Sequence, residues 1–336
     1  MDIATHGLAS LALLRAVWPR APREMWIAVV VAGTAPDLDL LSVWAGAQRY
    51  LAWRGTYTHA LLTAFLLSLA AATAYRLVAG ALLRERFPVG RFFMLVFSAQ
   101  CLHIVLDLCG TMPVAVLWPF VSRRLAADWI PNVDPWIIAL LLASLLFPEL
   151  LRLVTDEIGV RSKKTRGRVG ALMGFSLILL YLGVRAEFHR GATALMEARS
   201  YHGEVPQHVA AFPESFSPFA WQGLIETERA LLRVEVNEGF GGSFDPEDAT
   251  ALFKPEPSAA LDAAEHTRAA ARFLRVARFP IASVEGTAGG TRVEIRDLAY
   301  PASGETNREV LAVIDVDRAN RVQSERIVSR SEMEAD

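Results

Sequence analysis

The chain contains little charge and almost no cysteine. Only 21% of its 336 residues are charged while 53% are hydrophobic, and the mean hydropathy is +0.29. This composition excludes a disordered chain and is unusual for a soluble globular protein. The two cysteines, Cys101 and Cys109, would lie about 12 Å apart on a helix. That distance is too long for a disulfide, and their spacing is not that of zinc ligands.

Several functional signatures are also missing. The sequence has no phosphate-binding loop, no dinucleotide-binding glycine fingerprint and no Gly-x-Ser-x-Gly nucleophile motif. Its formal net charge of -2 gives no indication of nucleic-acid binding. These absences exclude the common nucleotide-binding and serine-hydrolase classes as first hypotheses.

The charge that is present is divided unevenly. Residues 1–187 carry 18 Lys and Arg against 12 Asp and Glu, whereas residues 188–336 carry 16 against 24. Seven of the eight tryptophans also belong to the first part. We therefore expect a basic transmembrane domain over residues 1–187 and an acidic soluble domain over residues 188–336.

Long apolar runs predict the membrane helices of the first domain. A bilayer span needs ~20 mostly apolar residues, and the runs 60–83, 92–121, 135–154 and the shorter 169–184 approach or exceed that length. Two weaker runs, 8–18 and 26–44, are expected to form a helical hairpin. The predicted fold is thus an α-helical membrane bundle of about four to five helices or hairpin segments.

Basic loops orient this multi-pass bundle. Arg84, Arg86 and Arg91 lie in one loop, and five Lys or Arg residues lie in the loop 161–168. Because Lys and Arg are concentrated in cytoplasmic loops, both loops should be cytoplasmic. Residues 122–134 and the domain 188–336 should then be extracytoplasmic.

The second domain is predicted to be small and α+β. Its apolar spacing indicates one helix over residues 258–278, and alternation indicates strands over 230–236, 291–298, 309–316 and 321–328.

The ionisable residues of the apolar half are few and therefore informative, because such residues at membrane depth usually mark a site. His103 and Asp107 lie four apart, on one face of a helix. Asp37 and Asp39 lie two apart and face the same way in an extended segment. Three imidazoles and three carboxylates form a donor set suited to a divalent Zn, Mn or Fe ion. The predicted metal set is His6, Asp37, Asp39, His59, His103 and Asp107.

Each of these residues also has a structural interpretation. His103 by itself is better explained by packing and hydrogen bonding inside the bundle, and only its pairing with Asp107 makes a metal ligand an equal alternative. Asp37 could cap the following helix, with Asp39 favoured in its first turn by the helix dipole. His59 could be an ordinary interfacial residue.

The ordered motifs resemble the YdjM/YfhP type of membrane-bound, metal-dependent hydrolase. They are Thr5-His6-Gly7, Pro36-Asp37-Leu38-Asp39, the segment 54–61 that ends in Thr58-His59-Ala60-Leu61, His103 with Asp107, and Trp118-Pro119. Residues 212–221 and 278–280 are similar to the longer, YfhP-like members. Three features depart from the family pattern: Trp53 replaces a His, Ala60 replaces a Ser, and one extra residue precedes Thr58.

The resemblance implies a metal-activated water that attacks an ester bond. It implies His6, Asp37, His59, His103 and Asp107 as ligands, with Asp39 as a further ligand or the general base. The family is distantly similar to zinc-dependent phospholipase C and related nucleases, which suggests a phosphoester or lipid-like substrate at a bacterial-type cytoplasmic (inner) membrane. Asp134 matches a further acidic position of the longer members, or caps the helix that begins at Pro135.

Two other functions remain open. The first is a non-catalytic membrane anchor that presents an extracytoplasmic interaction domain. The second is a transporter with His103 and Asp107 as a proton relay, although the few spans and the lack of repeated halves count against it.

Overall fold

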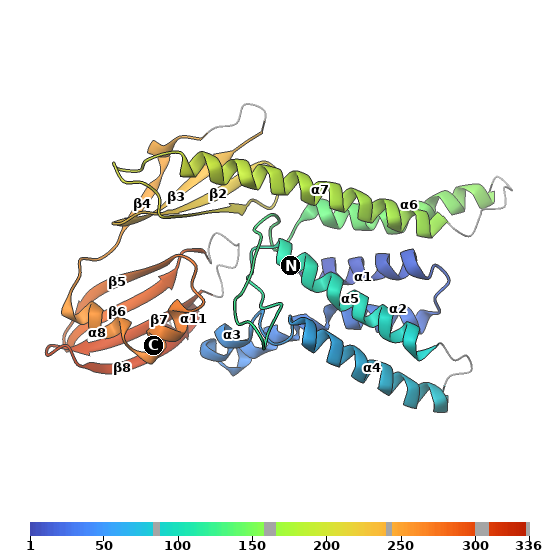
Figure 1. Cartoon of the computed structure of the whole chain (residues 1–336), viewed down its shortest axis with the longest axis horizontal. Coiled ribbons are helices and arrows are strands. Elements are labelled where there is room, and N and C mark those ends of the chain that lie inside the picture. Colours follow the sequence, from blue (N-terminus) through green and yellow to red (C-terminus); the bar gives the residue numbers. More distant parts are fainter. Residues whose placement is uncertain (83–87, 158–165, 240–243, 300–308, 334–336) are drawn as a thin grey trace. The chain divides into compact units, whose positions relative to one another are not determined.

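A computed structural model of the chain describes residues 1–82, 88–157, 166–239, 244–299 and 309–333 (Figure 1). The chain divides into two compact units. One comprises Met1–Leu40 with Arg54–Ala186, and the other Leu41–Trp53 with Glu187–Asp336. Most basic residues of the two predicted cytoplasmic loops, namely Arg84, Arg86, Arg161, Lys163 and Lys164, lie outside the described residues.

The first unit is a bundle of apolar helices, and this confirms the predicted fold class. Three helical segments are long and apolar enough to cross a membrane: Arg23–Ala45, Val89–Cys109 and Gly167–Glu197. Three more are apolar but shorter within the described residues: Ile3–Val17, Leu61–Leu77 and Pro135–Leu151. The helices are α1 (Ile3–Val17), α2 (Arg23–Thr34), α4 (Leu61–Leu82), α5 (Val89–Cys109), α6 (Pro135–Glu157) and α7 (Arg166–Glu197).

Two of the apolar runs, one predicted to span the membrane and one predicted to belong to the helical hairpin, differ in shape from the observed helices. The run 92–121 is not one helix, because α5 ends at Cys109 and Gly110 continues in extended backbone. The run 26–44 is helical throughout but changes type. The α-helix α2 gives way to the 3-10 helix η1 (Ala35–Ala45) just before Pro36, whose nitrogen cannot donate an α-helical hydrogen bond. Both irregularities fall beside the ionisable residues.

Close packing brings the helices together around α1, which contacts α2, α5 and α6. A Cβ atom on Gly33 would lie 1.8 Å from Oγ of Ser10, so only glycine allows α2 to approach α1 this closely. A buried hydrogen bond of 3.0 Å from Gln100 Nε2 to Ser68 Oγ joins α5 to α4. The interfaces of α1, α2 and α5 therefore fix the backbone positions from which the site residues project.

The second unit contains two four-stranded antiparallel sheets, each with its strands in sequential order. All four predicted strands are confirmed, as β3, β6, β7 and β8, while the other four strands were not predicted. The first sheet is β1 (His208–Pro213), β2 (Ala220–Glu226), β3 (Ala230–Asn237) and β4 (Thr250–Phe253). The second is β5 (Pro280–Thr287), β6 (Gly290–Asp297), β7 (Val310–Asp317) and β8 (Val322–Ser329). Short helical segments complete the unit: α3 (Ala47–Trp53), η2 (Pro246–Asp248) and α11 (Arg330–Met333).

The single helix predicted over residues 258–278 is wrong, because the segment forms two helices. They are α8 (Ala259–Glu265) and α9 (Arg268–Leu274). Thr267 lies between them in extended backbone and accepts a hydrogen bond of 3.2 Å from the N–H of Ala270. A threonine in this position is an N-cap, which starts a new helix rather than continuing the old one.

Candidate metal centre

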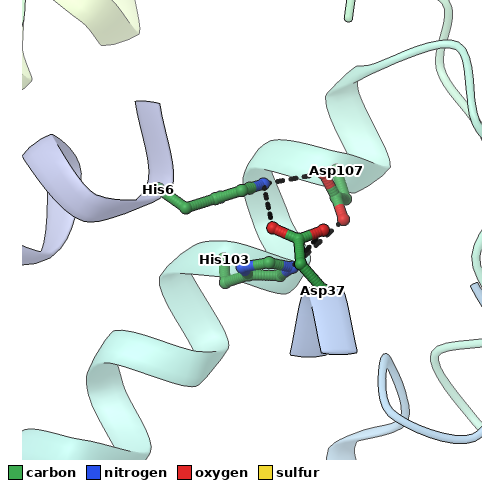
Figure 2. A group of neighbouring side chains, drawn as sticks. All are labelled: His6, Asp37, His103 and Asp107. Atoms are coloured by element: carbon green, nitrogen blue, oxygen red, sulfur yellow. Dashed lines mark hydrogen bonds and ion pairs between the residues drawn. The ribbon is translucent and has the colours of Figure 1, made fainter. Parts of the chain in front are cut away.

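Four buried side chains from three elements converge in the first unit (Figure 2). His6 comes from α1, Asp37 from η1, and His103 and Asp107 from α5. One donor atom from each residue lies within 4.8 Å of the others. None of the four residues is more than 4% exposed. Figure 2 shows both imidazoles pointing towards the same pair of carboxylates.

Individual distances show how closely these groups approach. His6 Nε2 lies 3.1 Å from one oxygen of Asp107, and His103 Nε2 lies 3.2 Å from the other. Each of the two Nε2 atoms is 4.0 Å from an oxygen of Asp37. The two imidazole rings stack with centroids 3.6 Å apart. The i, i+4 placement expected for His103 and Asp107 on one helix face is therefore observed.

His59 adjoins this four-residue group from the turn that precedes α4. Its Nε2 atom lies 2.9 Å from Asp107 Oδ2 and 3.3 Å from His103 Nε2. Asp107 is thus contacted by three imidazoles. The α-amino group of Met1 also contacts Asp107 Oδ1.

Asp39 lies behind His59 and is not a member of the four-residue group. Its Oδ2 atom is 3.2 Å from His59 Nδ1 and accepts a hydrogen bond of 2.8 Å from the N–H of Gly55. Its Oδ1 atom accepts one of 2.9 Å from the guanidinium of Arg54. Asp39 is therefore held by its neighbours on the far side of an imidazole, which is the position of a residue that orients a ligand. Its predicted role as a ligand or general base stays a prediction.

The segment that carries Arg54 and His59 depends on one glycine. Gly55 has a φ of +65°, and a Cβ atom there would lie 2.6 Å from the carbonyl oxygen of Pro113. Both observations require glycine in this turn. The backbone N–H of Gly55 can consequently reach Asp39.

Asp37 provides the clearest test of whether the site suits a cation. Neither of its carboxylate oxygens has a hydrogen-bond partner, although the residue is only 4% exposed. The nearest guanidinium nitrogen, of Arg54, is 3.7 Å away, which is an ion-pair distance but not a hydrogen bond. Burying a carboxylate without hydrogen bonds is costly, so buried charges are normally paired or coordinate a metal. The open oxygens of Asp37 therefore fit a metal ligand.

The imidazoles fit the same purpose. His103 Nδ1 lies 2.7 Å from the carbonyl oxygen of Gly33, which can only accept a hydrogen bond. Nδ1 of His103 therefore donates to this carbonyl, which leaves Nε2 as the nitrogen that faces the carboxylates. In the same way, Nδ1 of His59 faces Asp39 Oδ2 at 3.2 Å, and Nε2 of His59 faces the four-residue group. Hydrogen bonds of this kind from the outer nitrogen are the usual support of metal-binding histidines.

The remaining motif residues have other positions. Asp134 is a helix cap, because its Oδ1 accepts the N–H groups of Trp136 at 2.9 Å and Ile137 at 3.1 Å. Its Oδ2 accepts the hydroxyl of Tyr181 at 2.9 Å. Trp53 is half exposed.

Three supporting groups were not among the predicted site residues. They are Arg54, Thr58, whose hydroxyl donates to Asp39 Oδ2 at 3.2 Å, and the carbonyl of Gly33. The first two lie inside a quoted motif, so a signal for them existed in the sequence. A backbone carbonyl has no signal of this kind.

A helical membrane bundle with a buried His/Asp group that could hold a metal ion is the class defined by fold and site together. The family model of the YdjM inner membrane protein matches residues 1–192, a range that contains every residue of this group. The chain belongs to the YdjM inner membrane protein family. Comparison with curated proteins found no match, and comparison with solved structures found none.

Proposed function

We propose that the protein is a metal-dependent hydrolase of the inner membrane that cleaves phosphoester bonds in a lipid-like substrate. The observation that carries this proposal is the buried carboxylate of Asp37, whose two oxygens lack hydrogen bonds and face two imidazoles. The substrate class is supported by the resemblance to zinc-dependent phospholipases and by the membrane-embedded helices.

His6, Asp37, His103 and Asp107 would hold the ion, with His59 as a fifth donor at the edge of the group. A bound divalent ion supplies Lewis acidity, which lowers the pKa of a water to near ~7 and polarises the bond under attack. Zinc suits the His/Asp donor set, and Mn or Fe are alternatives.

The residues around the donors would keep them oriented. The carbonyl of Gly33 holds the proton of His103 on Nδ1, and Asp39 holds that of His59 on Nδ1. Arg54 balances the charge of Asp39 and lies close to Asp37. In this proposal Asp39 is a positioning residue, because it holds His59 from the side opposite to the four-residue group.

Metal analysis combined with hydrolysis assays tests the proposal. The purified protein should contain a stoichiometric divalent metal, and Asp37→Asn and His103→Ala should lose it. Activity against phospholipids and bis(p-nitrophenyl) phosphate should fall by ~100-fold or more in both variants, as expected when a metal ligand is removed. Asp134→Asn is the matched control, since Asp134 is also a buried aspartate but caps a helix.

Two results would contradict the proposal in different ways. A wild-type protein without bound metal would refute the metal centre and favour the non-catalytic anchor. A stoichiometric metal without turnover of any phosphoester would keep the centre but refute the hydrolase.

We further propose that the second domain is extracytoplasmic, on the basis of the basic loops discussed above. A reporter enzyme fused after Asp336 tests this orientation. Activity of a reporter that functions only in the cytoplasm would overturn it.

A further inference from the structure

The connection between α5 and α6 contains a small hairpin whose tip is apolar and exposed. Val114 and Leu125 close the hairpin with two backbone hydrogen bonds of 2.9 Å, one in each direction. At the tip, 82% of the surface of Phe120 is exposed, together with 51% of Leu117 and 44% of Val121. A loop in water rarely exposes three such side chains side by side, and contiguous exposed apolar patches mark interaction sites.

The base of the hairpin is attached to the segment that carries His59. The N–H of Ala115 donates to the carbonyl of Gly55 at 2.7 Å. The N–H of Leu61 donates to the carbonyl of Val116 at 3.0 Å. His59 therefore lies in a stretch of chain that the hairpin holds on both sides.

Side chains strengthen this attachment. The guanidinium of Arg124 donates to Thr56 Oγ1 at 2.6 Å. The ring of Trp118 packs edge-on against Tyr57, with centroids 4.9 Å apart. The hairpin is thus joined by hydrogen bonds and a ring contact to the segment that carries His59 beside the candidate metal centre.

We propose that the hairpin formed by residues 114–125 is a membrane-docking element. Its tip lies in the bilayer at the boundary between headgroups and acyl chains, and Arg123 beside it contacts lipid phosphates. This surface goes beyond the proposed hydrolase function, because it does not require a metal or a reaction.

Two observations identify the partner as the bilayer. The hairpin is hydrogen-bonded to the start of α4 through Val116 and Leu61, and there Leu61, Phe65 and Leu66 are 39%, 43% and 52% exposed on an apolar helix. The charge near the tip is of one sign, since residues 110–127 include Arg123 and Arg124 but no Asp or Glu. Aromatic and basic side chains in combination are typical of the membrane–water interface.

Quenching by brominated lipids tests this docking without measuring activity. A tryptophan introduced by Phe120→Trp adds fluorescence to the full-length protein in vesicles of phosphatidylglycerol and phosphatidylcholine. Bromine on the upper acyl chain should quench the added signal, as expected for an aromatic residue at the interface. Phe216→Trp is the matched control, because Phe216 is 85% exposed in the second unit. Its added signal should respond to aqueous acrylamide and not to bromine.

The role of Arg123 has its own measurement. Replacing phosphatidylglycerol with phosphatidylcholine should reduce the bromine quenching of Phe120→Trp, and adding Arg123→Gln should remove this dependence on lipid charge. Arg20→Gln, another exposed arginine, should leave it intact. If Phe120→Trp is quenched by acrylamide as strongly as Phe216→Trp and not by brominated lipid, the docking proposal is wrong. If Arg123→Gln changes nothing, the phosphate contact is wrong.

Discussion

Replacing Asp37 by asparagine should change the stability of the protein in opposite directions with and without metal. Asparagine has the shape of aspartate but no charge. In the presence of a chelator, Asp37→Asn removes a buried carboxylate that has no hydrogen bond. Removing such a group raises the free energy of unfolding by ~1–3 kcal/mol. The variant also loses the attraction of Asp37 to Arg54 at 3.7 Å and to His6 at 4.0 Å, which reduces the gain. The variant should therefore be as stable as the wild type, or more so.

With metal present the order should reverse. An ion at about 100 times its dissociation constant stabilises the folded state by ~2.7 kcal/mol. For a unit of this size, 1 kcal/mol corresponds to a shift in Tm of ~2–4 °C, so the wild type should gain ~5–10 °C. Asp37→Asn should gain little, because half of the carboxylate donors of the four-residue group are then lost.

Thermal unfolding in detergent measures both effects, with EDTA in one series and Zn²⁺ or Mn²⁺ in the other. The scan rate must be the same throughout, because membrane proteins of this size often unfold irreversibly. Asp134→Asn again provides the control, since weakening a helix cap should lower Tm equally in both series. If Asp37→Asn lowers Tm by the same amount with and without metal, Asp37 is a structural residue and the cation argument fails.

Three further predictions rest on contacts in the structure. Asp39→Asn should weaken metal binding ~10–100-fold without abolishing it, because His59 keeps its lone pair but loses a charged acceptor; competition with a fluorescent chelator measures this. Asp297→Ala removes the acceptor of three backbone N–H groups at 2.8–3.0 Å and should lower the free energy of unfolding by ~2–4 kcal/mol in urea titrations. The hydrogen bond from Arg292 holds the pKa of Asp315 below its ordinary value. This pair should therefore stabilise the fold above pH ~4 and stop doing so as the pH falls further, by under ~1 kcal/mol because it is partly exposed, and Asp315→Asn should remove that dependence.

The helical bundle could be predicted because its signal is local. An apolar run long enough to span a bilayer is visible in any window, and α4 and α6 begin within one residue of the predicted starts. The end of α5 was misjudged because the apolar composition continues past Gly110 into the hairpin. Composition cannot distinguish a buried helix from an exposed apolar loop, whereas Pro113 and Pro119 could have indicated the break.

In the second unit, strands could be predicted where polar and apolar residues alternate or where apolar residues follow one another. Strand β6 alternates polar and apolar residues, and strand β7 begins with five consecutive apolar residues; both strands were predicted. Strand β2 contains Gly223, which leaves room for Met196, since a Cβ atom there would lie 2.2 Å from its sulfur. Glycine is required at this position by a side chain that is distant in the sequence. The sequence of the strand alone shows only a residue that disfavours strands.

Some residues of the candidate site could be predicted from local spacing, and others could not. The i, i+4 spacing of His103 and Asp107 could be read directly, because helix geometry converts spacing into position. The different positions of Asp37 and Asp39 could not be predicted from their spacing. The two carboxylates were expected to face the same way, but a 3-10 helix replaces the extended segment and directs them to different partners. No sequence pattern indicates which of the two meets Arg54 more closely.

Asp37 and Asp39 have different partners, and this difference supports the proposed divalent ion. Asp39 and Arg54 form a close pair, at 2.9 Å, that is electrically neutral. Asp37 and Asp107 carry two further negative charges beside the imidazoles of His6 and His103, and the α-amino group of Met1 contacts Asp107. In the proposed centre, a divalent ion would find the carboxylates of Asp37 and Asp107 and the imidazoles of His6 and His103 as its donors. Because imidazole donors favour zinc and its neighbours over Mg²⁺ or Ca²⁺, zinc is the ion that we propose for this donor set.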